Sequence, residues 1–292
     1  MSLLSRSELC IVIYPEQIVL LGMTRQRTLR GYSRKLDERL RVACDESADI
    51  DAPWSRAFRA LEKTLPAFAK RNMHTTVILS NRFMFYALVP WCDELNDEAE
   101  EMMHARHCMD SMYGDLLGDR ELRLSPNSRG AASLASAADK KMLDELRSLL
   151  SGTRLVSIQP HLMAACNISH MNLTGRSAWL ALLEPGNLCL VMLKEGRWNW
   201  MRNMRIGPIW QKELAMILER EASLAGGCEH SDEVLLWAPH LNCAQMRELA
   251  EIESNFSGAL TSRRWKFGNL QADAHSRFGL EAGALLAIAE AG

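Results

Sequence analysis

The sequence predicts an α/β protein made of two related lobes, and three observations carry that prediction. Apolar runs of strand length alternate with longer segments of helical periodicity. The predicted order strand–strand–strand–helix–strand occurs twice, with an insertion in the first copy, and mixed patterns of this kind are typical of α/β folds. The chain has 292 residues, of which 48% are hydrophobic and 24% charged, and this is enough for two compact lobes without disulfide or metal support.

The first copy opens with a predicted hairpin. The apolar runs 9–14 and 18–23 are joined by a turn at Pro15-Glu16, and two apolar runs around a short turn signal are typical of a hairpin. A basic third strand is expected over 27–36. A helix follows from about Pro53, because apolar side chains recur at helical spacing, at Trp54, Phe58, Leu61, Leu65 and Phe68.

The middle of the chain predicts a further pair of strands and an acidic helix. Runs 75–79 and 82–89 are strand-like, with a turn at Ser80-Asn81. Asn96-Asp97 can supply the cap of the helix that follows, and Gly114 ends it. The first copy is then completed by a short strand, a helix, a strand and a helix over 131–134, 139–150, 154–158 and 160–171.

The second half repeats the opening. Strand-like runs 177–183 and 188–193 flank the turn Glu184-Pro185-Gly186-Asn187, whose residues suit a tight turn. We therefore expect a first lobe over 1–174, with an inserted subdomain at about 82–135, and a second lobe over 175–292. The remaining elements of the second lobe are a strand, a helix, a strand and a closing helix, expected over 197–206, 208–224, 234–237 and 280–289.

Composition and charge exclude several classes of protein. A net charge of −2 with a pI near 6.5 argues against a nucleic-acid-binding protein held by bulk charge. No run is apolar and long enough for a signal peptide or a membrane-spanning helix, so we expect no direct insertion into a membrane. The eight cysteines show no zinc-finger or C-x-x-C spacing, which favours reduced thiols and a cytoplasmic location.

Several segments spread over the chain resemble one group of assembly proteins. These segments are the strand–turn–strand 77–83 and 86–91, the end of the acidic helix at 111–114, and the segment 155–165. There the sequence is similar to PilM of type IV pili, MshI of mannose-sensitive pili and the cytoplasmic part of GspL of type II secretion.

The resemblance implies an actin-like, ribonuclease H-like fold, in which a βββαβα unit is duplicated and each lobe has a central sheet of mixed direction. It further implies a cytoplasmic adaptor or scaffold of a bacterial pilus or secretion complex. A membrane-anchored assembly protein would be its partner and would hold it at the inner membrane, and oligomer formation stays open. The alternative is a nucleotide-binding actin-like ATPase or a sugar-kinase-like enzyme.

Actin-like ATPases hold nucleotide phosphates on two hairpin turns, and the resemblance implies where those turns lie. Phosphate needs close backbone N–H groups, hence glycine, and an Asp that positions metal and water. The first turn, 14–17, has neither residue, and Pro15 has no N–H. The second retains part of the pattern, so we expect only a vestigial nucleotide site, at Glu184, Gly186 and Asn187. No catalytic residue is expected, an enzyme is disfavoured, and so are ATP and Mg²⁺ as cofactors.

Two other clusters admit alternative interpretations. His104, His107 and Cys108 share a helix face and could bind zinc with Cys92, but a helix surface that carries two histidines is favoured, so no metal site is expected. A basic run has two alternative interpretations. It could face anionic lipid or an acidic partner, or its charges could keep an edge strand from pairing with another chain. It comprises Arg25, Arg27, Arg30, Arg34, Lys35, Arg39 and Arg41.

Overall fold

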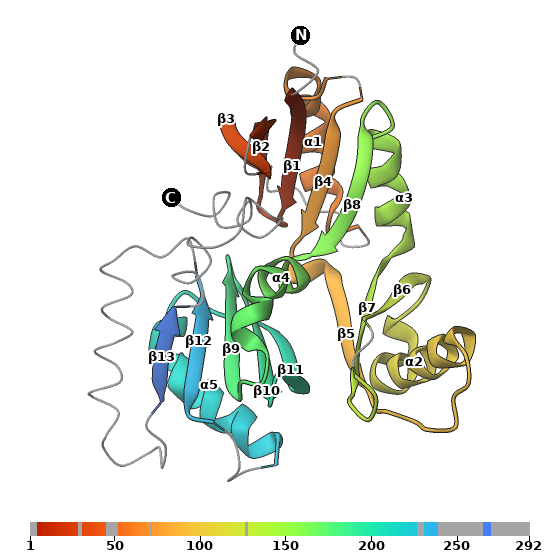
Figure 1. The fold of residues 1–292 in the computed structure, drawn as a ribbon, viewed down its shortest axis with the longest axis vertical. Coiled ribbons are helices and arrows are strands. Elements are labelled where there is room, and N and C mark those ends of the chain that lie inside the picture. Colours follow the sequence, from red (N-terminus) through yellow and green to blue (C-terminus); the bar gives the residue numbers. More distant parts are fainter. Residues whose placement is uncertain are drawn as a thin grey trace. The chain divides into compact units, whose positions relative to one another are not determined.

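The computed structural model describes residues 5–28, 31–44, 52–70, 72–125, 128–226, 231–238 and 265–269. The described residues form two compact units. The first unit contains those of 1–84 and 138–168, and the second contains those of 85–137 and 169–273 (Figure 1). The lobe limits expected at 174 and 175 and the inserted subdomain stay predictions.

The first unit is built on a five-stranded sheet in the order β3-β2-β1-β4-β8. The first three strands are antiparallel neighbours, whereas β1 and β4, and β4 and β8, run parallel, so the sheet is of mixed direction (Figure 1). Its central strand β1 is apolar over Leu9–Ile13 and fully buried there, which is typical of a strand covered on both faces. The strands span Ser5–Ile13 (β1), Gln17–Thr28 (β2), Gly31–Ala43 (β3), His74–Leu79 (β4) and Arg154–Pro160 (β8).

The third strand lies further along the chain than the sequence predicted. Residues 27–28 still belong to β2, and the strand expected over 27–36 runs instead over Gly31–Ala43. The reason is the register of the hairpin, in which Thr28 is paired with Gly31 and Gln17 with Ala43. The basic side chains expected on one strand are therefore divided between two neighbouring strands.

Three helices are connected to this sheet. Helix α1 (Ser55–Phe68) buries the face that carries Phe58, Leu61 and Leu65, as its periodicity predicted. Helix α3 (Lys140–Leu149) begins at Asp139, whose side chain accepts a hydrogen bond from the N–H of Met142 at 3.2 Å. Helix α4 (His161–Leu173) starts directly after β8.

A small three-stranded sheet in the order β5-β7-β6 belongs to the second unit, apart from the first residue of β5 and the last two residues of β7. Helix α2 (Glu98–Tyr113) buries Ala105 and Met109 in the same cluster as Ala87 and Val89 of this sheet. Strand β6 was not predicted, although charged and apolar residues alternate over part of its sequence Arg-Glu-Leu-Arg-Leu-Ser, and no position on it is buried. The strands span Met84–Val89 (β5), Arg120–Ser125 (β6) and Ser133–Asp139 (β7).

The second unit also contains a five-stranded sheet in the order β11-β10-β9-β12-β13. Its first three strands are antiparallel neighbours and β9 runs parallel to β12, which repeats the arrangement of β1, β2, β3 and β4. The duplicated unit that the sequence predicted is therefore present. The strands span Ala178–Glu184 (β9), Asn187–Lys194 (β10), Arg197–Arg205 (β11), Glu233–Trp237 (β12) and Lys266–Asn269 (β13).

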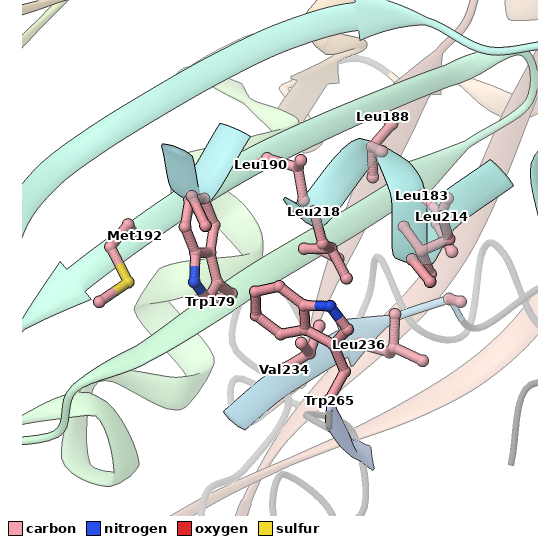
Figure 2. Packing of buried hydrophobic residues seen from close by; sticks show 14 residues of the cluster. Trp179, Leu183, Leu188, Leu190, Met192, Leu214, Leu218, Val234, Leu236 and Trp265 are labelled. Carbon is pink, nitrogen blue, oxygen red and sulfur yellow. The ribbon is translucent and has the colours of Figure 1, made fainter. Parts of the chain in front are cut away.

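Helix α5 (Trp210–Leu224) covers one face of this sheet through a dense apolar cluster (Figure 2). Leu214 and Leu218 of the helix belong to this cluster together with Trp179 of the sheet. The ring of Trp265 meets that of Trp179 edge to face, with centroids 6.4 Å apart, a geometry that aromatic pairs favour. The closing helix expected over 280–289 lies outside the described residues, and no helix in the described part of the chain is long and apolar enough to cross a membrane.

Candidate functional site

The carboxyl ends of the parallel strands β1, β4 and β8 meet at one edge of the first-unit sheet. Ligands of open α/β sheets bind at such an edge, because the loops that follow the strands converge there. Here the β1–β2 turn brings Glu16 to the edge, the turn after β4 brings Asn81 and Arg82, and the start of α4 brings His161. Tyr14 lies beside His161, with ring centroids 6.3 Å apart.

The first hairpin turn is closed by the chain itself. The N–H of Tyr14 donates to the carbonyl of Gln17 at 2.9 Å, and the N–H of Cys44 donates to the carbonyl of Glu16 at 2.9 Å. Pro15 has no N–H to offer. The carboxylate of Glu16 accepts hydrogen bonds at Oε1 from Nη2 of Arg56 at 3.3 Å and from Nη1 of Arg82. An internal anion therefore engages two arginines at this turn.

The turn after β4 is fixed by small polar side chains. Ser80 donates its N–H to the carbonyl of Ile13 at 2.9 Å, and its hydroxyl accepts from the N–H of Arg82 at 3.2 Å. The side-chain oxygen of Asn81 accepts from the N–H of Leu162 at 3.1 Å, at the first turn of α4. Ser80 and Asn81, which the sequence indicated only as a turn, thus orient Arg82 toward Glu16.

The second hairpin turn holds the three residues of the expected vestigial nucleotide site. Glu184 and Asn187 are paired across the end of β9 and β10, and Gly186 has φ +68°, which favours glycine. Both Glu184 and Asn187 are buried. Asn187 donates through Nδ2 to Oδ1 of Asn203 at 2.8 Å, so this side chain is used within its own sheet. Nucleotide binding at these residues stays a prediction.

The zinc alternative involves residues of α2 and the segment before it. Sγ of Cys108 lies 4.0 Å from Nε2 of His104, whereas His107 is exposed. Cys92 and His104 line a cavity of about 30 Å³ together with Glu101. The described residues contain no group of three His, Cys, Asp or Glu side chains that could hold a metal ion.

The basic run is spread over β2 and β3. Arg25 forms an ion pair of 3.6 Å with Glu8, and Arg39 and Arg41 lie on the edge strand β3. Burial and the neighbouring charge of Arg41 lower the pKa of Arg39. Arg30 and the side chains of Arg27 and Arg34 lie outside the described residues, so the choice between a binding surface and a guarded edge stays open.

The structure brings further basic side chains to this run that the sequence did not indicate. Arg6 on β1 is paired in register with Arg25, and His74 on β4 is paired with Arg154 on β8. Burial lowers the pKa of His74, and the guanidinium groups of Arg6 and Arg154 lower it further. These residues lie far apart in the sequence, and only the strand order brings them to the same end of the sheet.

The six cysteines in the described part of the chain are free, as expected for reduced thiols. Cys10, Cys166 and Cys189 are buried. Burial raises the pKa of Cys166 to about 12, which makes its thiol a poor nucleophile at neutral pH. The remaining two cysteines, Cys228 and Cys243, lie outside the described residues.

Comparison with known proteins identifies the fold of the chain. No model of a known protein family matches the sequence, and no curated protein matches it. A Bacteroides thetaiotaomicron protein of unknown function with an actin-like ATPase fold is 10% identical, with a TM-score of 0.54 over 85% of this chain and 88% of that chain.

Two further similar structures come from assembly systems. The cytoplasmic domain of EpsL, an inner membrane component of the type II secretion system of Vibrio cholerae, is 12% identical, with a TM-score of 0.54 over 94% of this chain and 97% of that chain. A chain of a PilM–PilN type IV pilus biogenesis complex is 13% identical, with a TM-score of 0.50 over 97% of this chain and 85% of that chain. At these identities the likeness establishes the fold, and the predicted actin-like fold is confirmed.

Proposed function

We propose that this chain is a cytoplasmic adaptor of a type IV pilus or type II secretion assembly complex. In this role it binds a membrane-anchored assembly protein and is held at the inner membrane through that partner. Its task is to connect other components, and it transforms no substrate.

The observation that carries the proposal is the state of the two hairpin turns. A phosphate group at the first turn would have to displace Glu16 from Arg56 and Arg82 and would find no N–H on Pro15. At the second turn, Asn187 already donates to Asn203. Residues that would serve a nucleotide in an actin-like ATPase are therefore engaged within the chain, which supports a binding protein over the ATPase or sugar-kinase-like alternative.

The similar structures support a pilus or secretion assembly as the kind of complex to which the chain belongs. One is the cytoplasmic domain of an inner membrane component of type II secretion, and another is a PilM–PilN complex. Both align with this chain over most of its length. A two-lobed protein of this kind still offers sheet edges, to which an extended peptide can add main-chain hydrogen bonds with few matching side chains. The long edge strand β3 (Gly31–Ala43) is such an edge in the first unit.

Co-purification tests the proposal. The chain is co-expressed with each membrane protein that has a single spanning helix and is encoded by a neighbouring gene, and it is then captured from a detergent extract at high salt. We expect one such protein to co-purify in stoichiometric amount and to be lost when its cytoplasmic tail is deleted. Capture that does not depend on any cytoplasmic tail would contradict the adaptor role.

A further inference from the structure

The arginine clamp of the first unit, defined as Arg56, Arg82 and the carboxylate of Glu16 between them, has more donors than its occupant uses. Both arginines bond to Oε1 of Glu16. Among the described residues, Oε2 of Glu16 and Nε of Arg56 are buried without a hydrogen-bond partner. A guanidinium group carries five N–H donors in a planar fork that matches both oxygens of a carboxylate. The clamp therefore holds its own carboxylate by one oxygen only.

The start of helix α1 adds to the positive potential at the clamp. Arg56 lies in the first turn of this 14-residue helix, and the N-cap residue Trp54 makes no side-chain cap hydrogen bond. The hydroxyl of Ser55 is buried without a partner in the described part of the chain. Free N–H groups at a helix N-terminus favour a nearby anion. Two arginines, one of them in the first turn of α1, thus bind a single carboxylate.

The clamp is accessible to a ligand, and its occupant can leave. The side chains of Arg56 and Arg82 are 17% and 18% exposed, whereas that of Glu16 is 43% exposed. Glu16 also lies in a two-residue turn at the end of a hairpin, so its side chain can rotate into solvent without disturbing the backbone pairs of β1 and β2. The arginines would then present a net charge of +2 at the carboxyl edge of the sheet.

We propose that Arg56 and Arg82 form a carboxylate-binding site that the chain fills with its own Glu16, and that the carboxylate of a ligand exchanges with Glu16. A carboxylate suits the site because the present occupant is one and because its two oxygens can engage both guanidinium forks. An Asp or Glu side chain on an extended segment of a partner presents this group. The assignment of the carboxylate to a partner rests on the proposed function, whereas the carboxylate-binding site itself does not.

Titration with succinate tests the site without any partner. Calorimetry at constant ionic strength compares the wild type with Glu16→Gln, which keeps the shape of the side chain and removes the competing charge. The matched control is Glu62→Gln, which makes the same change on the exposed face of α1. We expect Glu16→Gln to bind succinate at least about tenfold more tightly than the wild type and the control, because one like charge at about 4 Å has left the site.

A second substitution tests whether the tighter binding of succinate depends on the arginine clamp. Arg82→Gln in the Glu16→Gln background is expected to abolish the tighter binding. Equal affinities of Glu16→Gln and Glu62→Gln, or a gain that persists without Arg82, would overturn the proposal. Inorganic phosphate is titrated in parallel, and tighter binding of phosphate than of succinate would overturn the assignment to carboxylates.

The wild-type protein provides a readout that does not depend on the folding of any variant. In NMR spectra of the arginine side chains, succinate is expected to shift the Nε–H resonances of Arg56 and Arg82. The exposed Arg205 on β11 serves as the internal reference and is expected not to shift. Shifts of equal size at all three arginines would show screening by the added salt and would contradict a specific site.

Discussion

Asn81 accepts a hydrogen bond through its side-chain oxygen from the backbone N–H of Leu162 at 3.1 Å, and this contact joins the end of β4 to the start of α4. Asn81 is fully buried. The bond satisfies one of the N–H groups that a helix leaves free at its start. It also holds the turn that presents Arg82 to Glu16, so the same residue supports both the helix and the arginine clamp.

Replacement of Asn81 by alanine is expected to destabilise the protein by about 0.5–2 kcal/mol, the usual cost of losing a helix cap. Urea denaturation measures the free energy of unfolding. Asn96→Ala is the matched control, because Asn96 is exposed and bonds only to neighbours at Glu94 and Glu100. It should cost less than about 0.5 kcal/mol. Equal losses in the two variants would show that the bond to Leu162 stabilises nothing.

Gly196 lies where two backbone segments of the second unit approach closely. A Cβ there would lie 2.6 Å from the nitrogen of Gly175 and 2.9 Å from the carbonyl oxygen of Leu173, and φ of Gly196 is +77°. Gly196→Ala is therefore expected to destabilise the protein by at least about 1–2 kcal/mol, the cost of a left-handed conformation alone. In the control Gly152→Ala, the added Cβ meets no atom within 4 Å, and thermal unfolding should change little. A stable Gly196→Ala variant would contradict the close approach.

The cations at the start of β1 and β8 give His74 a measurable property. Burial lowers its pKa, then Arg6 and Arg154 lower it further, and Glu8 raises it. Because the folded-state pKa lies below the unfolded-state value, the contribution of His74 to stability is complete above the unfolded-state pKa. It is lost as the pH falls through that value toward the folded-state pKa.

An NMR titration of His74 checks this assignment. Arg154→Gln is expected to raise the pKa of His74, since it removes a neighbouring positive charge. Arg147→Gln removes the same charge from α3, where Arg147 pairs with Asp144, and should leave the pKa of His74 unchanged. An unchanged pKa in both variants would place Arg154 away from the histidine.

Nucleotide binding is expected to be weak. In calorimetry with ATP and Mg²⁺, the dissociation constant should be no tighter than about 0.1 mM, because phosphate competes with Glu16 for the arginines and meets no N–H at Pro15. A micromolar dissociation constant would contradict the proposed role of the turns. Phosphate release that is lost in Glu184→Ala would do the same and would favour the ATPase alternative.

The repeated strand order could be predicted because each element carries a local signal. The strands of the second unit appear as apolar runs, and the turn at Glu184-Pro185-Gly186-Asn187 has the residues that a tight turn requires. Strand β13 could not be predicted in this way. It contains only Lys266–Asn269 and is defined by its pairing with β12, and no local sequence pattern predicts that pairing.

The arginine clamp could not be predicted from the sequence, for a physical reason. Arg56 and Arg82 lie 40 and 66 positions from Glu16, on a helix and on the turn after a strand. Neither the period of a helix nor that of a strand relates the three residues. The sequence placed Glu16 in the first hairpin turn, but the two arginines that bind Glu16 follow only from the strand order β2-β1-β4 and the placement of α1.

Membrane fractionation with and without the partner tests the adaptor role most directly. The chain is expressed alone, and then with the membrane protein identified by co-purification, and its distribution between soluble and membrane fractions is measured at physiological salt. We expect the chain alone to stay in the soluble fraction and to move to the membrane fraction when the partner is present. Tight, salt-resistant membrane binding by the chain alone, or no movement with the partner, would contradict it.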